Sequence, residues 1–354
     1  MISKLKAMQP KNLTKAGYLA LAVTVCFILC WELSWRAKGY KVTFNDDKFL
    51  WANARSRAYE NNATVFIGSS RIKFDLDLPT WKKQTGEEAI QLSIVGTSPL
   101  LLLKDLADDE KFRGKLIVDI TEVLFFSPNP AFHKSAKEAI AFYHNRTPSE
   151  NLSSQINLQL ESGLVFLEER RFALNTLLSD LEIPDRPGVF SFPSFPKGFE
   201  WTSYNRQTYM SDLFLQNPDD IKKQTEIWQK LILGDPSPAI EGKALQEIFI
   251  EIKNAVDKIR NRGGKVLFVR TPCSGPMEEA EKKKYPRQSY WDQMLAFTNT
   301  VGIYYEDDSR TGQFVCPEWS HLSPHDAVLY THALVEQLRN QNWFTNTDHS
   351  FNSK

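Results

Sequence analysis

An uncharged apolar segment near the start of the chain constrains its fold more than any other feature. The segment runs from Gly17 to Trp31, and it reaches Trp35 if Glu32 lies near a membrane interface. That length gives about the 20 residues that a helix needs to cross a bilayer. The sequence therefore predicts a cytoplasmic tail and a transmembrane signal anchor over residues 1–36.

The charges on either side of the segment predict its orientation. The charged side chains that precede the segment are all lysines. After the segment, Asp46 and Asp47 soon balance the basic residues. Basic residues favour the cytoplasmic side, so we expect a single-pass protein with a cytoplasmic N-terminus and an extracytoplasmic domain. A cleaved signal peptide and a buried core helix are the alternatives. The exit sequence WELSWRAKGY offers no small-x-small cleavage site, which disfavours the first.

The overall composition excludes several classes of protein. Of 354 residues, 43 are basic and 43 acidic, and 42% are apolar, which is typical of a globular chain. Because zero net charge lacks the basic field that attracts phosphates, we expect no nucleic-acid partner. The four cysteines and six histidines contain no HExxH or other metal-binding pattern, so we expect neither a metal nor a cofactor.

After a polar stretch predicted as a linker over residues 37–62, short apolar strands alternate with helical patterns. This alternation is typical of an α/β fold with a parallel sheet and crossover helices. One helix should start at Ser98-Pro99, and another should carry the apolar stripe from Leu245 to Ile259 and end at Gly263. The domain should cover residues 63–345, followed by a tail over 346–354. Its expected strands are residues 64–67, 89–92, 115–120, 265–269 and 303–305.

Residues 124–235 are too long for a crossover connection and predict an insertion in this domain. Within it, residues 151–180 have a helical pattern. Residues 184–199 contain four prolines and four phenylalanines, and the prolines forbid a regular element there. Two interpretations stay open for this stretch: a loop pinned to the core by its phenylalanines, or an exposed apolar surface that faces a partner or the membrane.

Two local patterns could carry chemistry together. The first strand runs directly into Gly68, Ser69 and Ser70, which places a serine at the carboxyl end of a parallel strand, where open sheets hold reactive groups. Near the other end of the chain, Glu318 and His321 precede a helix. A carboxylate can hold imidazole in the tautomer that accepts a proton from serine. Ordinary turn chemistry is the alternative explanation of the serine.

The chain has a serine just after its first strand and an acid-x-x-His pattern near its other end. A sequence with this order of motifs resembles the SGNH (GDSL-like) hydrolase superfamily. The segments GSSR, RTPCSGP, YPRQSYWD and EWSHLSP look more narrowly like the membrane-anchored, extracytoplasmic SGNH-like proteins of bacteria that often act beside membrane-bound O-acyltransferases. The resemblance covers roughly residues 63–340 and implies a flavodoxin-like three-layer domain. It also implies that Ser70 is the nucleophile, His321 the general base and Glu318 its orienting acid. Gly96 would share an oxyanion hole with the Ser70 backbone N–H.

Three positions depart from the family pattern. Ser69 replaces the usual aspartate before the nucleophile, and Glu318 replaces an aspartate. The asparagine that usually completes the oxyanion hole has no clear match, so only Thr121 or a backbone group could substitute. Hydrolysis, acyl transfer and binding without reaction therefore all stay open.

The resemblance implies a serine-dependent O-acyl esterase or O-acyltransferase in the bacterial inner membrane, acting in the periplasm on an acylated envelope polysaccharide or glycan. A membrane-bound O-acyltransferase is a candidate partner. The alternatives are a non-catalytic glycan-binding or scaffold module and a lipid-acting esterase. Arg71 and Arg270, at predicted strand ends, are candidates for substrate binding or for surface ion pairs. Cys273 and Cys316 could form a disulfide or stay free.

Overall fold

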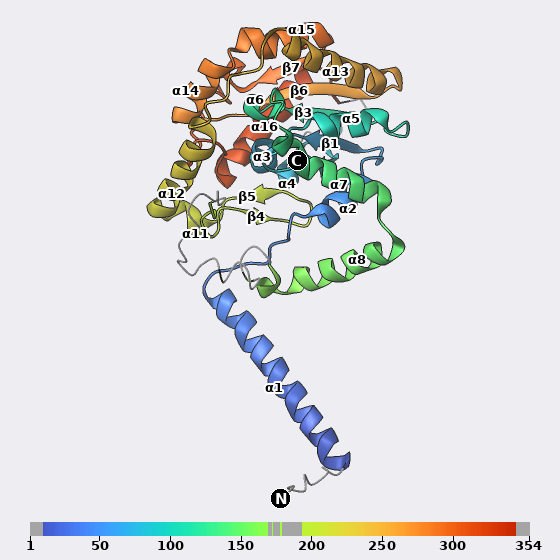
Figure 1. The fold of residues 1–354 in the computed structure, drawn as a ribbon, viewed down its shortest axis with the longest axis vertical. Helices are drawn as coiled ribbons and strands as arrows, with labels where there is room; N and C mark the ends of the chain where they lie inside the picture. The colour runs from blue at the N-terminus through green and yellow to red at the C-terminus, as the bar shows by residue number, and fades with distance from the viewer. Residues whose placement is uncertain (1–9, 169–171, 173–177, 179–192, 345–354) are drawn as a thin grey trace, which may run out of the picture. The chain divides into compact units, whose positions relative to one another are not determined.

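The structure is a computed structural model that describes residues 10–168, 172, 178 and 193–344 (Figure 1). The chain forms two compact units. One consists of Met1–Thr43 with Ile156–Pro184, and the other of Phe44–Gln155 with Asp185–Lys354.

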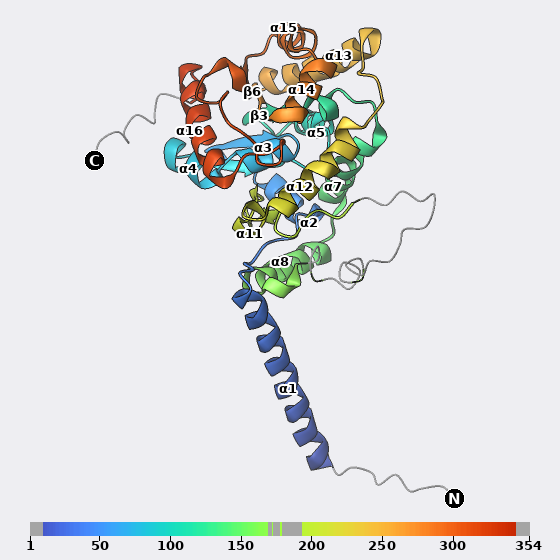
Figure 2. The same ribbon diagram turned by 90° about the vertical axis from the view of Figure 1, so that its left-hand side faces the viewer.

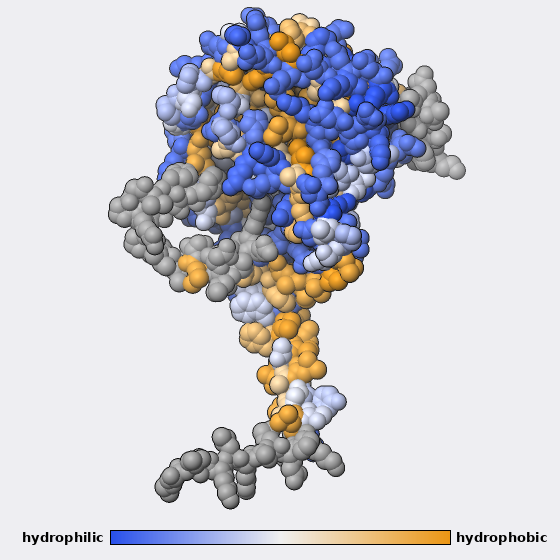
Figure 3. All heavy atoms as spheres, turned by 45° about the vertical axis from the view of Figure 1, so that its right-hand side comes forward, coloured by the Kyte–Doolittle hydropathy of each residue, from blue (hydrophilic) through white to orange (hydrophobic). Residues whose placement is uncertain are grey.

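A long helix dominates the smaller unit. Helix α1 covers Pro10–Ala37, and its Leu13–Ala37 portion is long and apolar enough to cross a membrane, with only 6% of its most apolar stretch buried. Hydrophobic side chains cover the face of α1 seen in Figure 3. The predicted apolar helix is therefore confirmed. The same unit contains the 3₁₀ turn η2, Val165–Leu167.

The larger unit is built around a five-stranded parallel sheet with the strand order β2-β1-β3-β6-β7. The α/β prediction is confirmed, and each expected strand matches the observed one within one residue at either end. The strands are β1 Ala63–Ile67, β2 Glu88–Gln91, β3 Lys115–Asp119, β6 Lys265–Arg270 and β7 Gly302–Tyr304.

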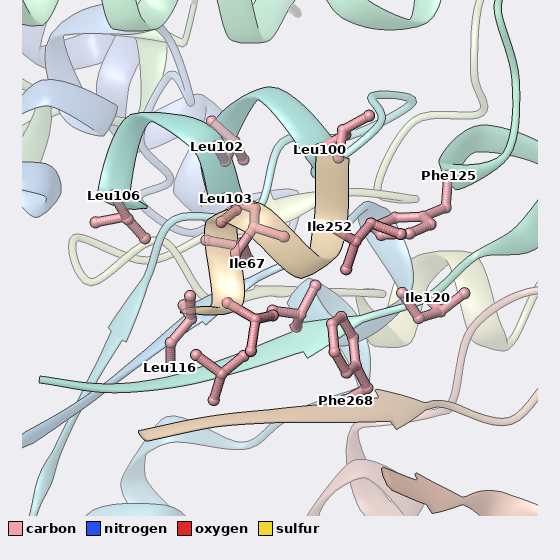
Figure 4. Close-up of a cluster of buried hydrophobic side chains, with 14 of the residues drawn as sticks. Ile67, Leu100, Leu102, Leu103, Leu106, Leu116, Ile120, Phe125, Ile252 and Phe268 are labelled. Carbon is pink, nitrogen blue, oxygen red and sulfur yellow. The ribbon is translucent and has the colours of Figure 1, made fainter. Parts of the chain in front are cut away.

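Alternate residues of each strand point to opposite sides of the sheet, and apolar side chains lie on both sides. Helices therefore cover both faces. On one face, Ile67, Leu116 and Phe268 belong to a buried cluster with residues of α5 (Leu100–Asp108) and α13 (Gly242–Asn261), as Figure 4 shows. On the other face, strand residues such as Phe66 and Ile117 pack with α4 (Leu78–Thr85) and α16 (Pro324–Asn340). Figure 2 shows the sheet between these two helical layers.

Helix ends follow the local signals in the sequence. Helix α5 begins one residue later than expected, at Leu100, with Pro99 at the N-cap. Helix α13 carries the predicted stripe, and Gly263 follows its end with φ 86°, a conformation that favours glycine. The side chain of Ser323 caps α16 by accepting a hydrogen bond from the Asp326 N–H at 3.1 Å.

The predicted linker contains an additional helix, which corrects the expectation for residues 37–62. Helix α2, Lys48–Ser56, is capped by Asp47 and buries Leu50 and Trp51. Its Arg55 is also buried and donates at 2.8 Å to both Asp105 and Asp109. The segment looks polar as a whole because the apolar residues occupy only one face of a short helix.

The insertion is folded over its described residues. The predicted helix at 151–180 is present as far as Gly163, where α8 (Pro148–Gly163) ends, and most of the remainder lies outside the described residues. Of residues 184–199, only 193–199 are described, and they form neither helix nor strand. Phe195 and Phe199 pack into a buried cluster, which agrees with a pinned loop for these two residues.

The other elements are short or connect these layers. They are α3 Ser70–Asp75, α6 Glu122–Phe125, η1 Pro130–His133, α7 Lys134–Asn145, β4 Trp201–Thr202, β5 Thr208–Tyr209, α11 Asp212–Leu215, α12 Pro218–Trp228, η3 Gln229–Leu233, α14 Gly275–Lys284, η4 Gln288–Asp292, α15 Gln293–Thr298 and η5 Tyr305–Asp307.

Candidate active site

The loops after β1 and β3 meet at the carboxyl edge of the sheet. Gly68 passes so close to β3 that an added Cβ would lie 2.7 Å from the Asp119 Cβ, so no side chain fits there. The next residue, Ser69, places its hydroxyl 2.7 Å from the hydroxyl of Thr121. The hydroxyls of Ser69 and Thr121 are thus engaged with each other.

Ser70 is the first residue of α3 and is half-buried. Its hydroxyl makes no hydrogen bond with any residue that the structure describes. Its backbone N–H lies in the first turn of a helix, where N–H groups have no intrahelical acceptor. Both polar groups are therefore available to a ligand.

The side chains of Glu318 and His321 are in direct contact. The Glu318 Oε1 atom lies 2.9 Å from Nδ1 of His321 and accepts the His321 backbone N–H at 2.6 Å. A hydrogen on Nδ1 leaves Nε2 as the acceptor nitrogen of the neutral imidazole. Nε2 has no hydrogen-bond partner among the described residues, although His321 is only 1% exposed.

The loop that carries His321 is attached to α3, the helix that begins with Ser70. Leu322 donates its N–H to Asp75 Oδ1 at 2.9 Å. Next to Asp75, the Phe74 ring lies against the imidazole with a centroid distance of 4.4 Å. Because Ser70 and Phe74 are four residues apart on a helix, they lie on the same face of α3. Ser70 therefore lies on the face of α3 that carries Phe74, but among the described residues no hydrogen bond joins its hydroxyl to His321 Nε2.

Aromatic side chains of the insertion complete the surroundings of His321. The rings of Phe199 and Trp228 have centroids 5.8 Å and 6.0 Å from the imidazole. The indole N–H of Trp228 also donates to Glu318 Oε2, so both carboxylate oxygens are engaged. The sequence analysis missed Trp228. The only available signal was that a buried indole N–H usually finds an acceptor, and this does not identify the acceptor.

Arg71 and Arg270 form the ion pairs that were one of the two expectations for them, but these pairs are buried and do not lie at the surface. They are 1% and 2% exposed. Glu281 accepts from Arg71 Nη1 at 2.9 Å and from Arg270 Nη2 at 2.6 Å, and Glu122 accepts from Arg270 Nε at 2.9 Å. Neither guanidinium group is free to bind an anionic polymer, and neither lies at the surface. Glu122 and Glu281 had no distinguishing signal in the sequence.

Cys273 and Cys316 are both buried and both free, so the disulfide considered from the sequence is not formed. Cys273 accepts a hydrogen bond from Arg270 at 3.3 Å. Burial raises the pKa of Cys273 to about 11, even though the nearby Arg270 lowers it. A thiol held protonated in this way is a poor nucleophile.

Gly96 lies in the loop after β2, beside the end of β1. Two residues earlier, Ile94 donates its N–H to the Gly68 carbonyl at 3.3 Å. Gly96 itself is exposed, has φ 63° and has no heavy atom within 4 Å of the position that a Cβ would take. The positive φ, rather than crowding, is what favours glycine here.

Two buried carboxyl groups flank the serine loop. Burial raises the pKa of Asp119 to about 6, although Arg270 and Arg71 lower it, and burial raises the pKa of Asp75 well above its usual range. The Oδ2 atoms of both, and the Tyr330 hydroxyl, have no hydrogen-bond partner in the described part of the chain. Perturbed carboxyl groups of this kind gather at functional sites. Among the described residues, no group of three or more His, Cys, Asp and Glu side chains could hold a metal.

Comparison with known proteins adds no relative to this description. No family model matches the chain, and no curated protein is similar to it in sequence. A serine hydroxyl, an imidazole with a free nitrogen and a carboxylate on the other nitrogen are the groups that nucleophilic acyl transfer requires.

Proposed function

We propose that this protein is a serine-dependent O-acyl esterase or O-acyltransferase, anchored in the bacterial inner membrane by α1, with an extracytoplasmic domain that acts on an acylated envelope polysaccharide or glycan. The groups at the site support the acyl chemistry, whereas the glycan and the compartment are implied by the SGNH resemblance alone. The strand order β2-β1-β3-β6-β7 supports the proposal. When the five strands of this sheet are counted in chain order, it is the 2-1-3-4-5 order of flavodoxin-like sheets, which bind ligands at their carboxyl edge.

The observation that carries the proposal is the attachment of the His321 loop to α3. Glu318 fixes the imidazole through Nδ1, while Phe74 and Asp75 hold the loop against the helix that presents Ser70. A binding site for a sugar would not need an imidazole in a fixed tautomer with its second nitrogen unpaired. A general base does need one.

In the proposed reaction, His321 Nε2 takes the proton from the Ser70 hydroxyl while the serine oxygen attacks the ester carbonyl. The backbone N–H groups of Ser70 and Gly96 stabilise the oxyanion. When the tetrahedral intermediate collapses, the bond to the alcohol breaks and His321 returns its proton to the leaving oxygen. Water or a sugar hydroxyl then attacks the acyl-serine by the same steps and releases Ser70.

A fluorophosphonate probe on the full-length protein in detergent tests this assignment, because such probes react with activated serines. We expect wild-type protein to be labelled and Ser70→Ala to remain unlabelled. Ser69→Ala is the matched control, since it removes the neighbouring hydroxyl and should leave labelling in place. Equal labelling of wild type and Ser70→Ala, or no labelling of either, would contradict the proposal.

A non-catalytic glycan-binding or scaffold module is the second candidate, and one observation favours it. Thr121, the only side chain expected to replace the missing oxyanion asparagine, is engaged by Ser69 instead. For such a module, Ser70→Ala and His321→Ala would retain full function in a cellular complementation assay. For an acyl-transfer enzyme, both variants would fail.

A further inference from the structure

Helix α8 carries an exposed apolar stripe that the proposed reaction does not use. Leu152, Ile156 and Leu160 follow one another at intervals of four residues, and they are 60%, 55% and 50% exposed. Side chains with this spacing lie on one face of a helix. The buried residues of α8, such as Leu158, lie on its opposite face. A surface helix normally presents polar residues where these three side chains lie.

The C-terminal end of α8 is attached to the last turns of α1. Arg36 donates to the carbonyl of Gly163, the last residue of α8, at 3.0 Å. The carboxylate of Glu32 accepts the backbone N–H of Val165 at 2.9 Å and that of Phe166 at 3.3 Å. Glu32 is only 6% exposed, so these hydrogen bonds are shielded from solvent. Residues 163–166 therefore lie at the same level as residues 32–36.

That level is the membrane interface if α1 spans a bilayer. Trp31 and Trp35 lie in the same turns of α1 as Glu32 and Arg36, and tryptophans together with the first charged residues typically mark the boundary between acyl chains and water. Hydrophobic side chains gather around this end of α1 (Figure 3). The C-terminal turn of α8 then lies within reach of the lipid headgroups.

We propose that α8 lies in the outer interface of the bilayer that α1 spans, with Leu152, Ile156 and Leu160 inserted at the boundary between headgroups and acyl chains. The occupant of the stripe is lipid. Helix α8 contains no lysine or arginine, and its other exposed residues are mainly serine, asparagine and glutamine. Its binding should therefore depend on apolar insertion and not on anionic lipids. The inference rests on the proposed anchoring by α1 and not on the proposed chemistry.

Depth-dependent quenching on the full-length protein in phosphatidylcholine nanodiscs tests this placement. An environment-sensitive fluorophore is attached to Ile156→Cys or Leu160→Cys in a background in which Cys26 and Cys30 are serine. Gln155→Cys, on the flank of the same helix, is the matched control. Quenchers in the upper acyl chain should reduce the signal at 156 and 160 several-fold more than at 155. Substituting anionic phosphatidylglycerol should leave this difference unchanged.

A label on native Cys26, within α1, separates failure of the anchor from failure of the inference. If lipid quenches Cys26 but quenches 156 and 160 no more than 155, α1 spans the bilayer and the inference is overturned. If labels at 156 and 160 report an apolar environment that lipid quenchers do not reach, protein covers the stripe and the inference is again overturned. If Cys26 itself is not quenched, the proposed anchoring fails together with the inference.

Discussion

Asp119 offers a test of the site that needs no substrate. It lies at the end of β3 and is fully buried. Its Oδ1 atom accepts the Thr271 N–H at 3.3 Å and the Thr271 hydroxyl at 3.0 Å, whereas Oδ2 has no partner among the described residues. Burial raises the pKa from 3.8 to about 6, against the opposing effect of Arg270 and Arg71. The folded protein therefore holds a proton that the unfolded chain releases earlier.

The sign of the effect on stability follows from linkage. Below pH 3.8 the carboxyl group is protonated in both states, and its contribution to stability is fully present. As the pH rises, the unfolded chain loses the proton first, so stability falls until the pH has passed about 6. At about 1.4 kcal/mol per pKa unit, this loss amounts to roughly 3 kcal/mol.

Asp119→Asn keeps an acceptor for Thr271 and removes the titration. We expect the free energy of unfolding of the variant, relative to wild type, to rise by ~3 kcal/mol from below pH 3.8 to above pH 6. Urea unfolding of the full-length protein in detergent across this range measures the difference. Asp257→Asn, which makes the same substitution at an exposed carboxylate of α13, is the matched control. A flat difference for Asp119→Asn would refute the raised pKa.

Two further substitutions test the buried polar contacts of the site by the same unfolding measurement. Trp228→Phe removes the donor to Glu318, and it should cost ~1.5–3 kcal/mol more than Trp81→Phe, whose buried indole N–H has no partner among the described residues. Trp228→Phe should also slow fluorophosphonate labelling, whereas an unchanged rate would make Trp228 purely structural. Glu281→Gln leaves two buried guanidinium groups undercompensated and should cost ~3–5 kcal/mol, against at most ~1 kcal/mol for Lys253→Ala in an exposed pair. A loss as small as that of Lys253→Ala would show that the network contributes little.

The sequence predicts those features that depend on local patterns. The strands are short apolar runs between turn residues, and both faces of a parallel sheet are buried, so their positions are clear without an alignment. The contact between Glu318 and His321 spans only three residues and precedes a helix with a capping serine, which fixes the loop locally. Features of this kind need no knowledge of the rest of the chain.

Other features depend on partners that are distant in sequence. Glu281 lies 210 residues from Arg71, and the sequence does not reveal whether an arginine at a strand end points into the site or into the layer beneath it. The same reason explains why Trp228 was missed, since its acceptor lies 90 residues away. The sequence predicts a linker where α2 forms, because nine residues give too little periodicity to stand out from a polar stretch.

The surroundings of His321 bear on the choice between hydrolysis and transfer. In the proposed reaction only the backbone N–H groups of Ser70 and Gly96 hold the oxyanion, and the lack of a further donor, typically ~3–4 kcal/mol, would slow attack by water and by a sugar hydroxyl alike. Phe74, Phe199 and Trp228 place aromatic surface around the imidazole, which disfavours bulk water at Nε2. A sugar hydroxyl held by its own binding contacts has an entropic advantage over water in such a site. Within the proposed function, these properties favour an O-acyltransferase over a free esterase, and the insertion that supplies Phe199 and Trp228 is the part of the chain that would determine the outcome.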